Sequence, residues 1–272
     1  MMDAFRICIL VEQPYWAQTQ PSGLGEALRV RGHHVALIDP QTKSSETEGD
    51  DWLADFDGVI ARGQSWPLVH LLNSAERRGL AVINRGMAVS ALHNKMNMAV
   101  ALASAEVPSL RPYEGALADL RRQIPTATYL KLYGIGDEVW AVRQTSPLPG
   151  RNGKAPKIEV QLLTLELRTL SLRCGNLFGL ELYGVDCLET DDGPVVIDIN
   201  DFPDYDGVPN VDERLAEYCQ RRIHYHRRQM HQKNWRAPVK PFTNGLAAYQ
   251  PGLIGARTPD FITEQEGRSY LH

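Results

Sequence analysis

Residue types suited to chemistry are most concentrated in a predicted β-hairpin whose turn is Thr190–Gly193. Asp198 and Asn200 are two residues apart on its second strand, so both side chains leave the same face. Asp186 stands on the first strand, at a distance from the turn that can place it opposite them. Two carboxylates and an amide oxygen on one face form an oxygen-only ligand set that suits Mg²⁺. The alternative is that Asp198 and Asn200 merely end a strand and begin a turn, where both types are common.

The elements that must position this hairpin begin with an alternating first half. Apolar runs rich in strand-forming residues predict strands at 6–11, 34–38, 57–61 and 80–84. Amphipathic stretches at helical spacing lie between several of them. Strands separated by helices pair in parallel through right-handed crossovers, so we expect an open α/β sheet. No GxGxxG motif follows the first strand, and a dinucleotide site therefore has no direct support.

The pattern changes after Pro108 and Pro112, which fix an extended connector. Before the connector, 90–106 is predicted as one long helix; beyond it, 128–133 and 138–144 alternate like an antiparallel strand pair. We therefore expect an α/β domain (1–88), a linker helix (89–112), an α+β domain with an antiparallel sheet (113–235) and an extended or poorly ordered tail (236–272).

The composition of the 272-residue chain is that of an ordinary globular protein, with 43% hydrophobic and 23% charged residues. No apolar run approaches the roughly 20 residues that span a bilayer, which excludes an integral membrane protein. The net charge of −4 provides no global field for a polyanion. The four cysteines have no CxxC spacing, so we expect reduced, mostly buried thiols in a cytoplasmic protein.

A basic run from Arg221 to Arg236 contains aromatic residues and could bind nucleic acid or an acidic partner. Such a run is more often a solvated helix face, whose cations also suit a helix C-terminus. We therefore expect no nucleic-acid partner.

The metal hairpin and the loop after it resemble the metal-binding end of the ATP-grasp superfamily. The resemblance lies in Asp186, in Val196-Ile-Asp-Ile-Asn200 and in the run Phe202–Pro209. In that superfamily a strand-borne acid and an acid-x-Asn pair hold Mg²⁺ (or Mn²⁺) against the phosphates of ATP. Two branches fit best: the RimK-like ATP-dependent carboxylate–amine ligases, and the ATP-grasp inositol polyphosphate kinases, whose Asp-Ile-Asn-x-Phe-Pro run is especially similar.

Two further stretches support the resemblance, which runs with gaps from about Phe5 to His224. The stretch 130–143 is similar to a strand pair with a nucleotide-contacting lysine and an arginine that faces substrate or phosphate. The stretch 84–112 is similar to the linker helix that opens an ATP-grasp domain. The resemblance implies that Lys131 and Lys95 contact the phosphates of ATP and that Arg143 stabilises the transferred phosphoryl group or an acyl-phosphate.

Each of these three residues also has a plain structural interpretation. Lys131 alternates with leucines, so its stem could cover apolar surface while its ammonium group stays in water. Lys95 lies in a predicted helix, where a solvated lysine is common. Arg143 could pair with Glu138 or Glu159 across neighbouring strands.

The sequence departs from the family pattern after Pro112, because only sixteen residues separate it from Tyr129. The family places a subdomain there, with a second lysine, a glycine-rich lid and part of the adenine pocket. We therefore expect the lid subdomain to be missing. Either another segment, a second copy of the chain or a partner protein supplies these parts, or the chain does not turn over ATP.

The loop after the metal strand bears on the substrate. Asp201, Asp204 and Asp206 would repel an inositol polyphosphate, whereas they suit a small-molecule or peptide amine. The sequence thus favours a RimK-like ligase that joins a carboxylate to an amine through an acyl-phosphate. The alternatives are an inositol-phosphate-type kinase and a lid-less, non-catalytic nucleotide-binding or scaffold protein.

Overall fold

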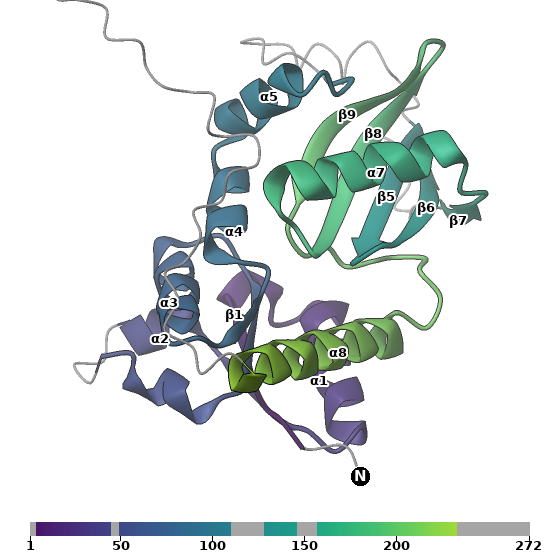
Figure 1. Cartoon of the computed structure of the whole chain (residues 1–272). Coiled ribbons are helices and arrows are strands. Elements are labelled where there is room, and N and C mark those ends of the chain that lie inside the picture. Colours follow the sequence, from purple (N-terminus) through teal and green to yellow (C-terminus); the bar gives the residue numbers. More distant parts are fainter. Residues whose placement is uncertain (1–3, 45–48, 110–127, 146–156, 233–272) are drawn as a thin grey trace, which may run out of the picture.

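The computed structural model describes residues 4–44, 49–109, 128–145 and 157–232. These residues form two sheets, each with helices packed against it (Figure 1). The predicted absence of the lid subdomain and the predicted extended tail concern segments that lie outside the described residues.

The first sheet is parallel, with four strands in the order β2-β1-β3-β4, which confirms the predicted open α/β sheet. Its strands are β1 (Arg6–Val11), β2 (His34–Ile38), β3 (Gly58–Arg62) and β4 (Ala81–Ile83). The helices of this half are α1 (Thr19–Val30), α2 (Pro40–Ser44) and α3 (Trp66–Arg77), with short 3-10 helices at Gln13–Tyr15 and Asp51–Asp55.

Strand β1 is apolar along almost its whole length because both faces of this sheet are covered. Ile7 and Ile9 pack in the core that includes α1, whereas Cys8 and Leu10 pack in the core that includes α3. A strand in a parallel sheet with helices on both faces has no solvent side, so apolar residues are favoured at every position.

The connection to the second sheet consists of two helices, α4 (Gly86–His93) and α5 (Lys95–Ser104). The prediction of one long helix over 90–106 is wrong, because the chain breaks at Asn94. The side chain of Asn94 accepts hydrogen bonds from the backbone N–H groups of Met96 and Asn97 and so caps α5. This break makes Lys95 the first residue of a new helix.

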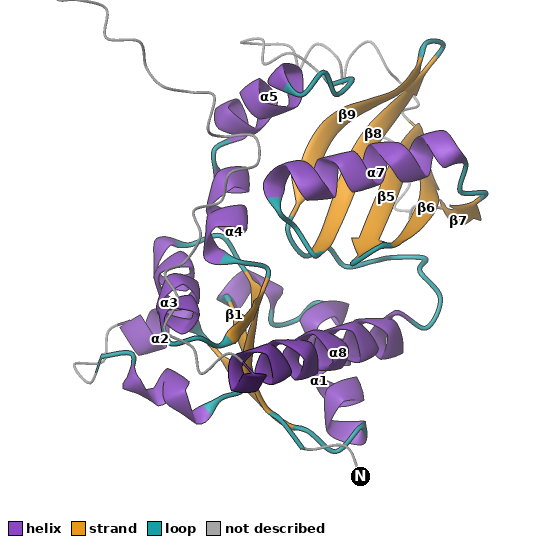
Figure 2. Ribbon diagram, viewed as in Figure 1, coloured by secondary structure: helices purple, strands orange, loops and turns teal. Residues whose placement is uncertain are grey.

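The second sheet is antiparallel, with five strands in the order β7-β6-β5-β8-β9. The strands are β5 (Thr128–Ile135), β6 (Glu138–Thr145), β7 (Lys157–Gln161), β8 (Leu182–Thr190) and β9 (Gly193–Asn200). Helix α7 (Leu165–Phe178) lies across one face of this sheet (Figure 2). The hairpin β8–β9 with its two-residue turn confirms the hairpin predicted around Thr190–Gly193, whereas β7 was not predicted.

Helix α8 (Val211–Gln232) follows the second sheet in sequence but packs beside α1 on the first sheet (Figure 1). Its apolar residues Leu215, Cys219 and Ile223 join the core of the first sheet. Gly58 in β3 permits this contact, because a Cβ there would lie 2.7 Å from Ile223. Helix α8 therefore shares the core of the first sheet, although it follows the second sheet in sequence.

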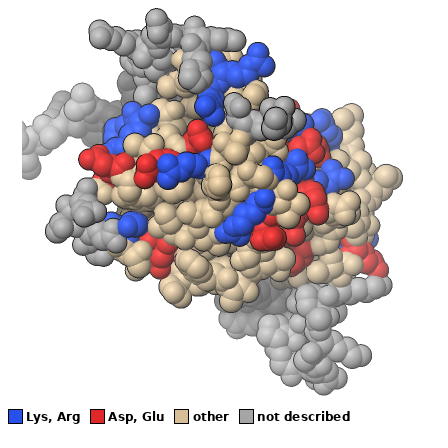
Figure 3. Space-filling view, turned by 90° about the horizontal axis from the view of Figure 1, so that it is seen from below, with Lys and Arg blue, Asp and Glu red and all other residues tan. Residues whose placement is uncertain are grey.

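The basic run at 221–236 begins on α8, where Arg221, Arg222 and Arg227 each pair with an acidic residue. Arg222 pairs with Glu181, and Arg221 pairs with Glu217 one turn earlier. Figure 3, which views the molecule from below, shows cations and anions interspersed. This arrangement is typical of a solvated helix face, as the sequence favoured.

All four cysteines are free and buried, as predicted for the thiols. Burial raises the pKa of Cys8 to about 12, so this thiol is unreactive at neutral pH. Among the described residues, no helix is both long and apolar enough to cross a membrane.

Candidate functional site

A row of charged residues crosses three neighbouring strands of the second sheet. Asp186 on β8 is paired with Asp198 on β9 and with Lys131 on β5. Directly paired residues share a face of the sheet, so these three side chains project to the side that α7 does not cover. Ile199 projects the other way and is buried in the core beneath α7.

A β-bulge brings the two carboxylates to one face. Cys187 is paired with Val196, whereas its neighbour Asp186 is paired with Asp198, so Ile197 is the extra residue. Without the bulge, Asp186 would lie opposite Ile197, and Asp198 would project toward α7.

Two lysines neutralise these carboxylates. The Nζ of Lys131 lies 3.2 Å from Oδ1 of Asp186, and the Nζ of Lys95 bonds to Oδ1 of Asp198 at 2.5 Å. Burial raises the pKa of Asp186, and the Lys131 ammonium opposes that rise. Lys95 comes from the first turn of α5, so the break at Asn94 delivers a cation to the row.

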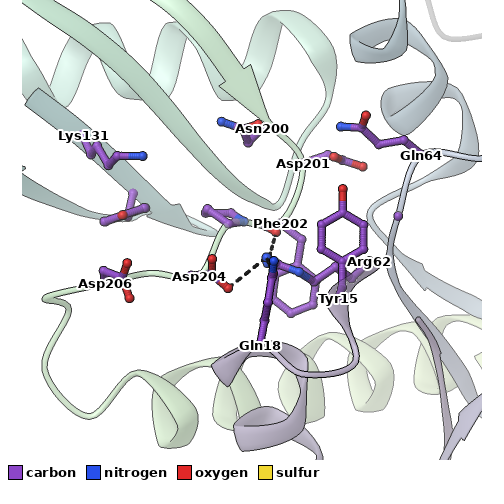
Figure 4. A pocket seen from close by; sticks show the side chains of 13 residues that line it. Tyr15, Gln18, Arg62, Gln64, Lys131, Asn200, Asp201, Phe202, Asp204 and Asp206 are labelled. Carbon is purple, nitrogen blue, oxygen red and sulfur yellow. Dashed lines mark hydrogen bonds and ion pairs between the residues drawn. The ribbon is translucent and has the colours of Figure 1, made fainter. Parts of the chain in front are cut away.

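Asn200 lies on the same face, two residues further along β9, opposite Gly184. Together with Lys131 it lines a cavity of about 260 Å³ (Figure 4). Tyr15, Gln18 and Gln64 line the cavity from the first domain, so it lies between the two sheets. The structure thus brings together five of the six predicted site residues, and Arg143 is the exception.

Arg143 lies on the opposite face of the sheet. It is paired with Leu130, whose side chain is in the core beneath α7, and its guanidinium pairs with Glu189 at 2.7 Å. The predicted contact with a transferred phosphoryl group does not match this position. The alternation of side chains along β6 is the physical reason, because neighbouring Val142 takes the face that Lys131 shares.

The donor atoms of Asp186, Asp198 and Asn200 are hard oxygens on one face, which fits Mg²⁺. Among the described residues, no three His, Cys, Asp or Glu side chains are grouped as a metal site. A complete coordination sphere would therefore need oxygen atoms from a ligand or water. Such partial protein ligation is usual for Mg²⁺ bound with a nucleotide.

Sequence reasoning missed Arg62, the last residue of β3, whose side chain is only 5% exposed. Its guanidinium donates to the carbonyl oxygen of Phe202, to Gln18 and, at 2.9 Å, to Asp204. Arg62 therefore connects the loop after β9 to the first domain through hydrogen bonds. A charged residue at the carboxyl end of a buried parallel strand was the available signal, because ligands of such sheets bind at that end.

A second buried link comes from Asn84, directly after β4. Its Nδ2 donates to the carbonyl oxygens of Leu182 and Asp201 at 2.6 and 2.9 Å. Its Oδ1 accepts from the N–H groups of Glu181 and Leu182 at 2.7 and 3.0 Å. Arg62 and Asn84 thus hold the two domains together through hydrogen bonds at one edge of the cavity.

The three acids of the loop do not act as three equal charges. Asp204 is paired with Arg62, and Asp206 is exposed beside the cavity. Asp201 is 7% exposed, and burial raises its pKa to about 7, so this carboxyl is partly protonated at neutral pH. The repulsion of a polyanion that the sequence predicted therefore rests mainly on Asp206.

Comparison with known proteins places these observations in a family context, although no protein-family model matches the chain. A probable alpha-L-glutamate ligase 2 of Shewanella sp. (strain MR-4) is 24% identical over 274 residues, covering 75% of this chain and 90% of the relative. The solved ATP-grasp ligase PsnB, with minimal precursor, Mg and ADP, superposes with a TM-score of 0.60 at 16% identity over 82% of this chain and 99% of that one. D-alanine–D-alanine ligase from Bacillus anthracis, complexed with ATP, gives 0.57 at 9% identity over 83% and 100%.

The resemblance to ATP-grasp ligases that the sequence motifs implied is therefore confirmed, in sequence by the probable alpha-L-glutamate ligase and in fold by the solved ligases. The relatives in sequence include probable alpha-L-glutamate ligases, and a RimK domain protein from Sphaerobacter thermophilus shares the fold with a TM-score of 0.55 at 18% identity over 78% of this chain and 98% of that one. The alignment with the Shewanella ligase is 274 positions long but includes only 75% of the 272 residues of this chain. About a quarter of its positions are therefore gaps in this chain.

Proposed function

We propose that the chain is an ATP- and Mg²⁺-dependent ligase of the RimK-like kind, which joins a carboxylate to an amine through an acyl-phosphate. The observation that carries the proposal is the row Lys131–Asp186–Asp198, with Lys95 and Asn200 beside it, at the edge of a polar cavity. The ligase names of the sequence relatives support the choice of reaction.

Phosphoryl transfer is catalysed mainly by positioning and by neutralising charge. Asp186, Asp198 and Asn200 would hold Mg²⁺, which supplies charge neutralisation at the phosphates when bound. Lys95 and Lys131 would bind phosphate oxygens from either side. The terminal phosphoryl group would pass to the substrate carboxylate, and the amine would then displace phosphate to form an amide.

The cavity suits an amino acid or a peptide amine as the acceptor. It is lined by groups of both signs, among them Lys131, Asp204 and Asp206, and by the amide of Asn200 (Figure 4). An ammonium group would be attracted to Asp206, whereas an inositol polyphosphate would be repelled by it. This arrangement favours the ligase over the kinase.

The first test is the melting temperature with Mg²⁺ and a non-hydrolysable ATP analogue. We expect the ligands to raise it by several degrees, because binding to the native state alone stabilises that state. Asp198→Ala should abolish the rise. Arg143→Ala is the matched control, since Arg143 lies on the other face and its loss should leave the rise intact. No rise in the unmodified protein at saturating nucleotide would contradict the proposal.

The second test is the product. Incubation with MgATP and a panel of amino acids and carboxylates should give ADP, phosphate and a new amide, detected by mass spectrometry. A phosphorylated hydroxyl compound without an amide would instead establish the kinase.

A lid-less nucleotide-binding protein is the second candidate. It is favoured by the short segment between Pro112 and Tyr129 and by the quarter of matched positions that this chain lacks. Transfer or hydrolysis of the terminal phosphate of ATP by the purified chain would dismiss it.

A further inference from the structure

We propose that Lys95 and Lys131 compete with the metal ion for the carboxylates of Asp198 and Asp186. On this inference the metal ion alone binds weakly. The lysines leave the carboxylates only when a triphosphate is present whose oxygens can bind the lysine ammonium groups. The inference rests on the proposed function, because it concerns the same row of residues. It goes further in stating that the metal ion and the nucleotide promote each other's binding.

The first observation is that both carboxylates already have a cation at contact distance. Lys95 bonds to Asp198, and Lys131 lies 3.2 Å from Asp186. The row therefore holds two positive and two negative charges in balance. A divalent cation added alone would share its ligands with two ammonium groups, and like charges at such distances oppose its binding.

A triphosphate added alone meets the converse difficulty. Its negative charges attract the lysines but are repelled by Asp186 and Asp198, which face the same side of the sheet. When both ligands are present, the metal can replace the lysines at the carboxylates, and the lysines can turn to the phosphate oxygens. Every charge then has a partner of opposite sign, so each ligand promotes the binding of the other.

The side chains have the freedom that this exchange needs. Lys95 is 52% exposed and stands at the first position of α5, and a lysine ammonium is a compact charge on a flexible stem. Asp198 keeps its orientation without Lys95, because its Oδ1 also accepts from the N–H of Ile199 at 2.9 Å. Removing Lys95 should therefore free the carboxylate and leave it in place.

The test measures Mn²⁺ binding without nucleotide, from the loss of the electron paramagnetic resonance signal of free Mn²⁺. We expect Lys95→Met to tighten Mn²⁺ binding about tenfold, within the usual range of coupling between sites. Lys95→Arg keeps the charge and should bind Mn²⁺ as the unmodified protein does. Arg221→Gln, which removes a cation from α8 outside the row, should also have no effect.

The companion measurement is calorimetric titration of the ATP analogue in EDTA, where we expect Lys95→Met to weaken binding about tenfold. Unchanged or weaker Mn²⁺ binding by Lys95→Met would overturn the inference, because Lys95 would then not compete with the metal ion for Asp198. Asp198→Asn should lose Mn²⁺ binding in either case, which confirms where the ion binds.

The two proposals fail in different ways. If Lys95→Met binds Mn²⁺ more tightly but neither the unmodified protein nor any variant binds nucleotide, the competition between lysine and metal holds, whereas the exchange with a triphosphate and the ligase function both fail. If nucleotide binds with Mg²⁺ but Lys95→Met does not tighten Mn²⁺ binding, the function stands and the exchange is wrong.

Discussion

The two faces of the five-stranded sheet differ in physical character, although the same strands build both. Beneath α7, alternate residues such as Leu132, Val185 and Ile199 are fully buried in an apolar core. On the other face, the residues between them include Lys131, Asp186 and Asp198, and these side chains remain between 21% and 34% exposed. The strand period of two therefore separates stability from chemistry within single strands.

The faces are also held differently. The apolar face is closed by a helix of the same domain, through packing that needs no particular polar partner. The charged face meets the first domain both through a buried apolar cluster that includes Tyr133 and Leu182 and through Arg62 and Asn84, whose hydrogen bonds span the two domains. This difference predicts that mutations on the two faces will have separable effects.

The largest effect is expected beneath α7. Leu132→Ala leaves a cavity at a fully buried position, which should lower the free energy of unfolding by about 2–5 kcal/mol. Urea unfolding measures the loss, and Leu132→Met is the control, with a cost below about 1.5 kcal/mol. If Leu132→Ala instead changed nucleotide binding without a loss of stability, the proposed division of roles between the two faces would be wrong.

A smaller loss is expected at the polar link. Asn84→Ala leaves two carbonyl oxygens and two N–H groups without this partner, and we expect a loss of about 1–3 kcal/mol in urea unfolding. Asn84→Asp should cost at least as much, because it turns a carboxylate oxygen toward the carbonyl oxygens of Leu182 and Asp201. Equal stability of Asn84→Asp and the unmodified protein would show that these bonds do not hold the domains together.

A third expected effect is a gradual dependence of the stability on pH. Burial raises the pKa of Asp201 from 3.8 to about 7, so between these values the folded state holds a proton that the unfolded state has released. The contribution of this carboxyl to the free energy of unfolding is fully present below pH 3.8. It is lost as the pH rises toward 7, by at most about 1.4 kcal/mol per pH unit. Asp201→Asn should flatten that decline in urea unfolding measured at several pH values. If the dependence of stability on pH were unchanged in Asp201→Asn, a group other than Asp201 would be responsible for it.

Local patterns in the sequence were enough for much of the fold. The hairpin around Thr190–Gly193 and the parallel strands of the first half follow from turn residues and hydrophobic periodicity, and these interactions act over a few residues. The ATP-grasp resemblance was predictable for the same reason, because its most specific motif is contiguous, at 196–209.

Longer-range features were not accessible in this way. Arg62 and Asp204 are 142 residues apart in sequence, and Asn84 and Leu182 are 98 apart, so no local pattern indicates their contacts. Arg143 was assigned to the site by its likeness to a motif, yet the pairing of β6 with β5 places it on the opposite face.

The sequence by itself determined that two acids and an asparagine would stand on adjoining strands, because strand propensity and a two-residue turn are local properties. Only the tertiary structure decided that the acids share a face, through the extra residue Ile197 in β9, since a bulge is set by how both faces of a sheet pack. The same is true of the cation that meets Asp198, because Lys95 reaches it only after the chain has broken at Asn94 and folded back over 103 residues of sequence separation.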